Sequence, residues 1–255
     1  DRPAVTALVA RNGVVSVWTG DLGERKWENR ACERGPGQIS ICDDGSMVSV
    51  VVPDATLVLD GTSGEALGEV RHAGLGGAGS VLSPDGKWLY TCVGEDTVAA
   101  FSTGDFKEAR RAGATGCGGG RLALSRDGRV LVAIGSEEGG LFGAAFDAAT
   151  LESAGTVSLG DGSRIVACAF TKDDRRLAAL TDGGVAVVQR DGWKVQRTIA
   201  TEANYGSIVA LDDHRVVLCN TQYVHTIDLD DGTIVVDAVT ADGRRIGSFR
   251  PSSFM

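Results

Sequence analysis

Residues 80–111 read SVLSPDGKWLYTCVGEDTVAAFSTGDFKEARR, and this stretch decides the fold class. Turn-forming residues interrupt it at Pro84-Asp85-Gly86, at Gly94-Glu95-Asp96 and at Thr103-Gly104-Asp105. The runs between these turns alternate apolar and polar side chains with the period of two that is typical of β-strands. The stretch therefore predicts four short antiparallel strands joined by tight turns.

The same pattern recurs along the whole chain. One apolar residue precedes the last turn of each unit, at Trp18, Leu59, Phe101, Phe146, Val188 and Ile227. The intervals between these positions are 41, 42, 45, 42 and 39 residues. Four-stranded units of about 42 residues are the blades of β-propellers. We expect the six apolar residues to be buried between neighbouring blades, where truncating a large side chain costs about 2–5 kcal/mol.

The two ends of the chain predict the number of blades. The first unit lacks an initial strand before Val5, whereas an extra run, RIGSF at 245–249, follows the sixth unit. If this run pairs into the first blade, the ring closes and no sheet edge stays unpaired. We therefore expect an all-β propeller of six four-stranded blades, with the first blade closed by the C-terminal strand. The alternative is a seven-bladed ring that lacks one blade through truncation.

These units together form one propeller domain, residues 1–255. The expected blades are 4–28 with 245–249, then 38–70, 79–112, 121–158, 165–200 and 207–239.

The turn SPDGKWLY at 83–90 resembles the SPDGKxLY turn of YVTN-type and WD40-like propellers, and CDDGSM at 42–47 and SRDGRV at 125–130 are looser copies. LVLDGTSGEALGEV at 57–70 is similar to the strand-turn-strand of quinoprotein-like repeats. The Trp-Asp and Gly-His pairs of true WD40 repeats are absent from the sequence. The resemblance implies a propeller, a fold that hosts enzymes, ligand binders and scaffolds alike.

Charge and hydropathy exclude several classes of partner. The formal net charge of -9 disfavours a surface built for nucleic acid or anionic lipid. No apolar run approaches the roughly 18 residues that a membrane-spanning helix needs. We therefore expect neither nucleic-acid binding nor direct membrane insertion.

The six cysteines lack the Cys-x-x-Cys spacing of zinc or redox sites, and most of them stand in short apolar runs. We expect reduced thiols and an intracellular setting. A luminal or secreted protein with paired cysteines is the alternative.

No motif in the sequence predicts catalysis, a metal or a cofactor. Gly74–Gly79 matches G-x-G-x-x-G, but a strand follows it where a dinucleotide site needs a helix. The Asp pairs at 43–44, 173–174 and 212–213 suit turn geometry. No G-x-S-x-G elbow occurs, and three scattered histidines predict no triad. Whether the chain is an enzyme stays open, with a non-catalytic role favoured.

Arginines gather in the loops that join the last strand of one blade to the first strand of the next. Because the first strand of each blade lines the channel, these loops lie near its axis. The expected partner-binding residues are Arg30, Arg71, His72, Arg110, Arg164, Tyr205 and Arg245. We expect a monomeric scaffold within a larger complex that binds an acidic peptide or protein through charge-assisted contacts. The alternatives are a channel-centred small-ligand binder or lactonase-like hydrolase, and a luminal propeller of a membrane assembly.

Overall fold

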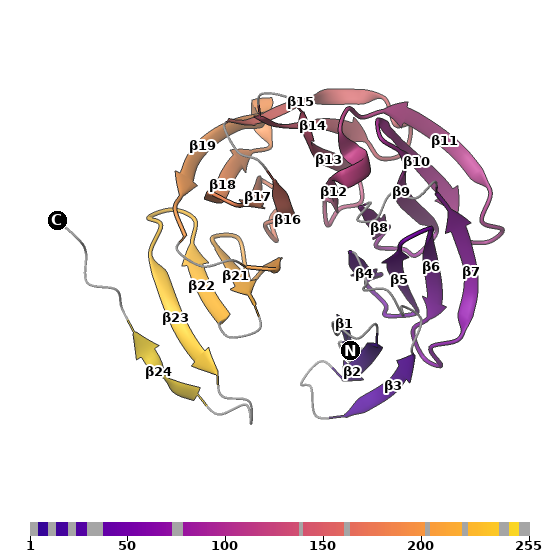
Figure 1. Ribbon diagram of the computed structural model, residues 1–255, viewed down its shortest axis with the longest axis horizontal. Coiled ribbons are helices and arrows are strands. Elements are labelled where there is room, and N and C mark those ends of the chain that lie inside the picture. Colours follow the sequence, from indigo (N-terminus) through magenta and orange to yellow (C-terminus); the bar gives the residue numbers. More distant parts are fainter. Residues whose placement is uncertain are drawn as a thin grey trace.

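The computed structural model describes residues 5–9, 14–19, 24–29, 38–72, 79–137, 140–160, 164–201, 205–220, 224–239 and 245–249. Six antiparallel sheets follow one another around an incomplete ring (Figure 1). The N-terminal sheet lies at one end of the ring, and the sheet that contains the last strands lies at the other (Figure 1). We number these sheets as blades 1 to 6 in chain order.

The first three blades contain eleven strands. Blade 1 comprises β1 (Val5–Val9), β2 (Val15–Thr19) and β3 (Arg25–Asn29). Blade 2 comprises β4 (Ile39–Ile41), β5 (Met47–Val52), β6 (Ala55–Asp60) and β7 (Ala66–Arg71). Blade 3 comprises β8 (Ser80–Leu82), β9 (Trp88–Gly94), β10 (Thr97–Ser102) and β11 (Glu108–Gly113).

The last three blades contain thirteen strands and follow the short 3-10 helix η1 (Cys117–Gly119). Blade 4 comprises β12 (Arg121–Leu124), β13 (Val130–Glu137), β14 (Gly140–Asp147) and β15 (Ser153–Gly160). Blade 5 comprises β16 (Ile165–Phe170), β17 (Arg176–Thr181), β18 (Gly184–Gln189) and β19 (Lys194–Ile199), with the 3-10 helix η2 (Asp191–Trp193) before β19. Blade 6 comprises β20 (Ser207–Ala210), β21 (Arg215–Cys219), β22 (Val224–Asp228), β23 (Ile234–Val239) and β24 (Arg245–Phe249).

The expected ring of six four-stranded blades, closed by the C-terminal strand, is wrong. β24 pairs with β23, with Asp237 opposite Ser248, and becomes a fifth strand on the outer edge of blade 6. Five blades thus have the four strands of a complete unit, and blade 1 has three. β23 presents a free edge six residues before β24 begins, so a local antiparallel pair closes a much shorter loop than pairing with blade 1. The described strands form these six sheets, which do not support the seven-bladed alternative either.

Consecutive blades are held together by apolar packing. Five buried clusters occupy the five junctions between blades 1 and 6. Because side chains alternate along a strand, Val187 packs toward blade 6 while its neighbour Val188 packs toward blade 4. This explains why the central strands read as nearly continuous apolar runs: both of their faces are buried.

Burial of the repeated apolar residue is confirmed in five blades. Their exposed fractions are low for Leu59 (1%), Phe101 (8%), Phe146 (3%), Val188 (0%) and Ile227 (0%). Each belongs to the cluster shared with the preceding blade. Trp18 is only half-buried, since it belongs to blade 1 and no described blade precedes it.

The turns between the first two strands of a blade share one hydrogen-bond pattern. The hydroxyls of Ser83, Ser125 and Thr171 donate to the carboxylate of the Asp two residues later, over 2.6–2.7 Å. The same hydroxyls accept the backbone N–H five residues later. Cys42 uses its thiol in the same way toward Asp44. Turn chemistry therefore explains the Asp-rich segments, as the sequence predicted.

Asp174 links two of these turns. In the turns of blades 2 to 4 a glycine with positive φ occupies the equivalent position, whereas Asp174 adopts φ 58° there. Its carboxylate accepts the backbone N–H groups of Arg126 and Asp127 in blade 4, at 2.7 and 2.9 Å. Asp tolerates this backbone conformation better than most residues. The substitution thus gains two charge-assisted hydrogen bonds between blades.

The turn between the last two strands supplies a second contact between blades. Phe106 and Trp193 have positive φ values of 55° and 53°, and each side chain lies against a glycine in the outer strand of the preceding blade. A Cβ atom on Gly68 would come within 2.3 Å of the Phe106 ring, and one on Gly155 within 2.4 Å of Trp193. Packing of these aromatic rings offsets a backbone strain of about 1–2 kcal/mol per residue.

A cluster of polar groups from Arg176, Asp213, His214 and Asp230, which we call the latch, joins blades 5 and 6. Arg176 is buried, and its Nη1 donates to Asp230 Oδ1 over 2.5 Å. His214 Nδ1 lies 2.6 Å from the other carboxylate oxygen, and Arg176 also donates to the carbonyl of Asp213. The hydrogen bonds from Arg176 first, and then from His214, lower the pKa of Asp230 below its ordinary value of 3.8.

We predict that Phe146→Ala lowers the free energy of unfolding by about 3–5 kcal/mol, because it opens a cavity between blades 3 and 4. Phe142→Ala, in the same strand, is the matched control, since this side chain is 39% exposed. Denaturant unfolding of the two variants checks the difference. Equal losses of stability would contradict the packing scheme.

We predict that Asp230→Asn lowers the melting temperature at pH 7, and that its deficit relative to wild type shrinks as the pH falls below about 4. The reason is that a carboxylate with a lowered folded-state pKa stabilises the fold above its unfolded-state pKa and loses this effect on protonation. Melting curves between pH 7 and pH 3 measure the effect. Asp213→Asn is the control, since Asp213 joins the latch only through its backbone carbonyl.

Candidate functional site

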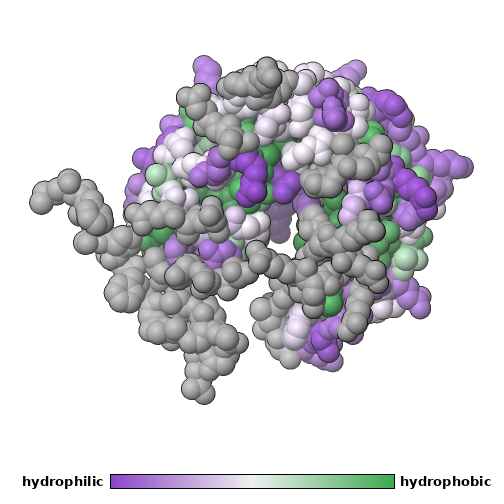
Figure 2. All heavy atoms as spheres, in the orientation of Figure 1, coloured by the Kyte–Doolittle hydropathy of each residue, from purple (hydrophilic) through white to green (hydrophobic). Residues whose placement is uncertain are grey.

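The first strand of each blade borders the central channel. In blades 2 to 6 these strands are β4, β8, β12, β16 and β20, and each is the inner edge of its sheet. The backbone groups on this edge face no further strand and need other partners. Figure 2 shows the molecule hollowed at the centre of the ring, with hydrophilic side chains on part of the wall.

Side chains at the start of these strands satisfy part of that need. Gln38, just before β4, reaches blade 4 and bonds both backbone groups of Leu122: Nε2 donates to its carbonyl over 2.7 Å, and Oε1 accepts its N–H over 3.3 Å. Arg121 Nε donates to the carbonyl of Val166 over 2.7 Å. Ser40 Oγ accepts the N–H of Leu82 over 2.8 Å. The contacts of Gln38 and Arg121 lie at the channel end where the strands begin, which we call the entry end, and the Ser40–Leu82 bond lies further along the strands.

Two cations meet at the entry end. Arg121 is the first residue of β12, and Arg164 directly precedes β16 in the next blade. Burial lowers the pKa of Arg121, and the positive charge of Arg164 adds to this effect. Arg164 is exposed, and its guanidinium forms no ion pair with any residue that the structure describes. The entry end therefore offers a local positive charge on a protein of net negative charge.

The other predicted partner-binding residues do not gather around Arg164. Arg71 is exposed at the end of β7, and its Nε donates to Glu69 over 2.8 Å. His72 is buried, lies 3.4 Å from the hydroxyl of Thr56, and has its pKa lowered by burial.

Arg110 and Tyr205 are held inside the fold. The guanidinium carbon of Arg110 lies 4.2 Å from the ring centre of Trp88, in a cation–π contact within blade 3. Tyr205 is buried, and its hydroxyl bonds to Nδ1 of His225. Arg30 lies outside the described residues. Arg245 begins β24 on the outer edge of blade 6, opposite Val239.

Arg121 is not among the partner-binding residues predicted from the sequence. It begins the first strand of blade 4 as Arg164 precedes that of blade 5, so an alignment of blades places both at the entry end. In the sequence, Arg121 looks like the last residue of the glycine-rich linker at 116–120, and an apolar run follows it. This context hid the equivalence of Arg121 and Arg164.

The three histidines contact different side chains in the described part of the chain. His72 contacts Thr56, His214 contacts Asp230 and His225 contacts Tyr205. Among the described residues, no three His, Cys, Asp or Glu side chains could jointly hold a metal ion. No helix in the described part of the chain is long and apolar enough to cross a membrane.

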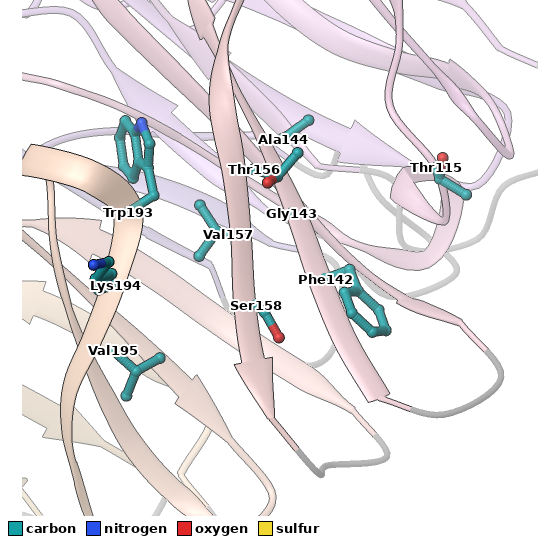
Figure 3. Close-up of a pocket in the computed structure, with 10 residues that line it drawn as sticks. All are labelled: Thr115, Phe142, Gly143, Ala144, Thr156, Val157, Ser158, Trp193, Lys194 and Val195. Atoms are coloured by element: carbon teal, nitrogen blue, oxygen red, sulfur yellow. The ribbon is translucent and has the colours of Figure 1, made fainter.

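A groove of about 680 Å³ lies along the outer strands of blades 4 and 5. Figure 3 shows Val157 pointing toward β19, which carries Lys194 and Val195, whereas Phe142 lies away from them. Lys194 is the only ionisable side chain that lines this groove. Among the described residues that line this groove, no acidic side chain accompanies Lys194.

Comparison with known proteins agrees with the fold. The scan against protein-family models finds no match, and the search of curated proteins finds none either. A solved structure of Kuenenia stuttgartiensis hydrazine synthase matches with a TM-score of 0.66 at 18% sequence identity, over 86% of this chain and 71% of that one. At this identity the likeness shows the fold alone. The chain belongs to the β-propeller class, and the comparisons support no particular repeat family within it.

We predict that Gln38→Leu lowers the free energy of unfolding by about 1–3 kcal/mol, because both backbone groups of Leu122 lose their partner. Gln196→Leu is the control, since Gln196 is exposed and bonds only to the side chain of Gln189. Chemical denaturation measures both variants. A Gln38→Leu protein as stable as wild type would contradict the role given to Gln38.

Proposed function

We propose that the protein is a non-catalytic interaction scaffold that holds an acidic segment of a partner protein at the entry end of its channel. The observation that carries the proposal is the juxtaposition of Arg121 and Arg164. Arg164 has no ion pair among the described residues, while Arg121 is held by backbone carbonyls. A carboxylate placed between them would relieve the repulsion and gain charge-assisted hydrogen bonds.

The fold suits such a role. Five packed junctions hold the blades together, so Arg121 and Arg164 are presented at the ends of packed strands without a large ordering cost. Arg71 would add a peripheral contact, because its exposed ion pair with Glu69 contributes little and is easily exchanged. The net charge of -9 makes long-range attraction of acidic partners weak, so recognition would depend on these local contacts.

The test uses a fluorescently labelled decapeptide of glutamate and measures binding by polarisation at low salt. Arg164→Glu is expected to weaken binding at least tenfold, because one attractive charge becomes repulsive. Arg129→Glu is the matched control: Arg129 is equally exposed and without an ion pair in the described chain, but it lies in a turn at the other end of the channel. Equal weakening by both variants, or no binding by wild type, would contradict the proposal.

Affinity capture from the native source then identifies the partner. A protein retained by wild type and Arg129→Glu but lost by Arg164→Glu would be the expected one. A set of captured proteins that is identical for all three forms would count against the entry end as the binding surface.

A further inference from the structure

A cavity extends along the channel from the Gln38–Leu122 contact to the turns at the end opposite the entry end. It has a volume of about 430 Å³ and is lined by the inner strands of blades 2 to 6 and by the turns that follow them. This volume lies within the range of pockets that bind small organic molecules. We call it the turn-side pocket; residues that line it include Ile41, Asp43, Val81, Leu124, Arg126, Lys172 and Val209.

The wall of the turn-side pocket is largely apolar. Ile41, Val81 and Leu124 come from the inner strands of blades 2, 3 and 4. Val209 in β20 is 59% exposed, the highest value among the exposed large hydrophobic residues of the described chain. An apolar side chain that lines a channel cavity and stays this exposed provides a surface on which the apolar body of a ligand would bury area.

Two cations stand together at the rim. Arg126 and Lys172 occupy equivalent positions in the turns of blades 4 and 5. Their backbone N–H groups are fixed to the next blade, that of Arg126 by Asp174 over 2.7 Å and that of Lys172 by the carbonyl of Asp212 over 3.3 Å. Both side chains are exposed and form no ion pair with the described residues.

Three carboxylates of the same two turns are already engaged. Asp174 accepts two backbone N–H groups, Asp127 accepts from Ser125 and pairs with Arg190, and Asp173 accepts from Thr171. The turns therefore fix the backbone of Arg126 and Lys172, while these three carboxylates form no ion pair with either side chain. Asp43 lines the pocket from blade 2 and disfavours a second acidic group on the ligand.

We propose that the turn-side pocket binds an organic anion with one acidic group, a carboxylate, sulfonate or phosphate ester, on an apolar body. The acidic group contacts Arg126 and Lys172, and the body lies on the wall formed by Leu124, Val81 and Val209. Arg126 and Lys172 stand in the turns, and Arg121 and Arg164 do not line the pocket, so separate variants test the two proposals and either can fail without the other.

The test compares two fluorescent probes that share one aromatic body. 8-Anilinonaphthalene-1-sulfonate carries a single sulfonate, and N-phenyl-1-naphthylamine lacks it. Wild-type protein is expected to bind the sulfonate at least tenfold more tightly than the neutral probe. The double variant Arg126→Ala/Lys172→Ala is expected to lose this preference, with a tenfold or greater weakening for the sulfonate only.

Two further variants locate the probe. Val209→Glu places a carboxylate on an exposed wall position, so it is expected to weaken sulfonate binding while the fold is retained, as checked by its melting temperature. Arg129→Ala removes an unpaired cation that does not line the pocket, and is expected to bind as wild type does. Equal affinity for the two probes, or unchanged sulfonate binding in the double variant and in Val209→Glu, would overturn the proposal.

Discussion

The face-to-face packing of consecutive sheets is the constraint on which the rest of this structure depends. No single blade could bury both of its apolar faces, so each relies on its neighbours. Val187 and Val188 show this directly, because adjacent residues of one strand belong to the cores of two different junctions. The repeated residue before the last turn, exemplified by Phe146, contributes to every junction from blade 2 onward. Stability of the ring is therefore a property of pairs of blades.

The apolar packing holds the blades together, and polar contacts fix how neighbouring blades are aligned. Turns between the first two strands lie side by side around the channel, and one turn donates to the next, as Asp43 N–H does to the carbonyl of Pro84 over 3.0 Å. The carboxylate of Asp174 adds a further hydrogen bond between the turns of blades 4 and 5. The Arg176–Asp230 ion pair links blades 5 and 6 in a similar way. The contacts of Asp174 have a second consequence: two backbone N–H groups occupy its carboxylate, which forms no ion pair with Arg126 or Lys172.

The channel thus has two chemically different ends. At the entry end Gln38 crosses to Leu122, and the positive charge of Arg164 acts on that of Arg121. At the turn side an apolar wall and two cations surround a cavity of about 430 Å³. Both proposed sites are compatible with a rigid ring, because neither requires a movement of the blades. Both proposals rest on individual charged side chains, since the fold itself hosts many activities.

The sequence by itself determined the propeller class, the turn chemistry and the burial of residues such as Leu59, because these depend on local periodicity and on turn-forming side chains. It did not determine how the ends of the chain pair: β24 follows the free edge of β23, and only the spatial neighbours of RIGSF decide this. It also did not show which arginines are free. Arg71, Arg110 and Arg164 look alike in sequence, yet Glu69, Trp88 and open solvent surround them respectively. Tertiary structure decided this, because the availability of a charge depends on partners that lie in other strands.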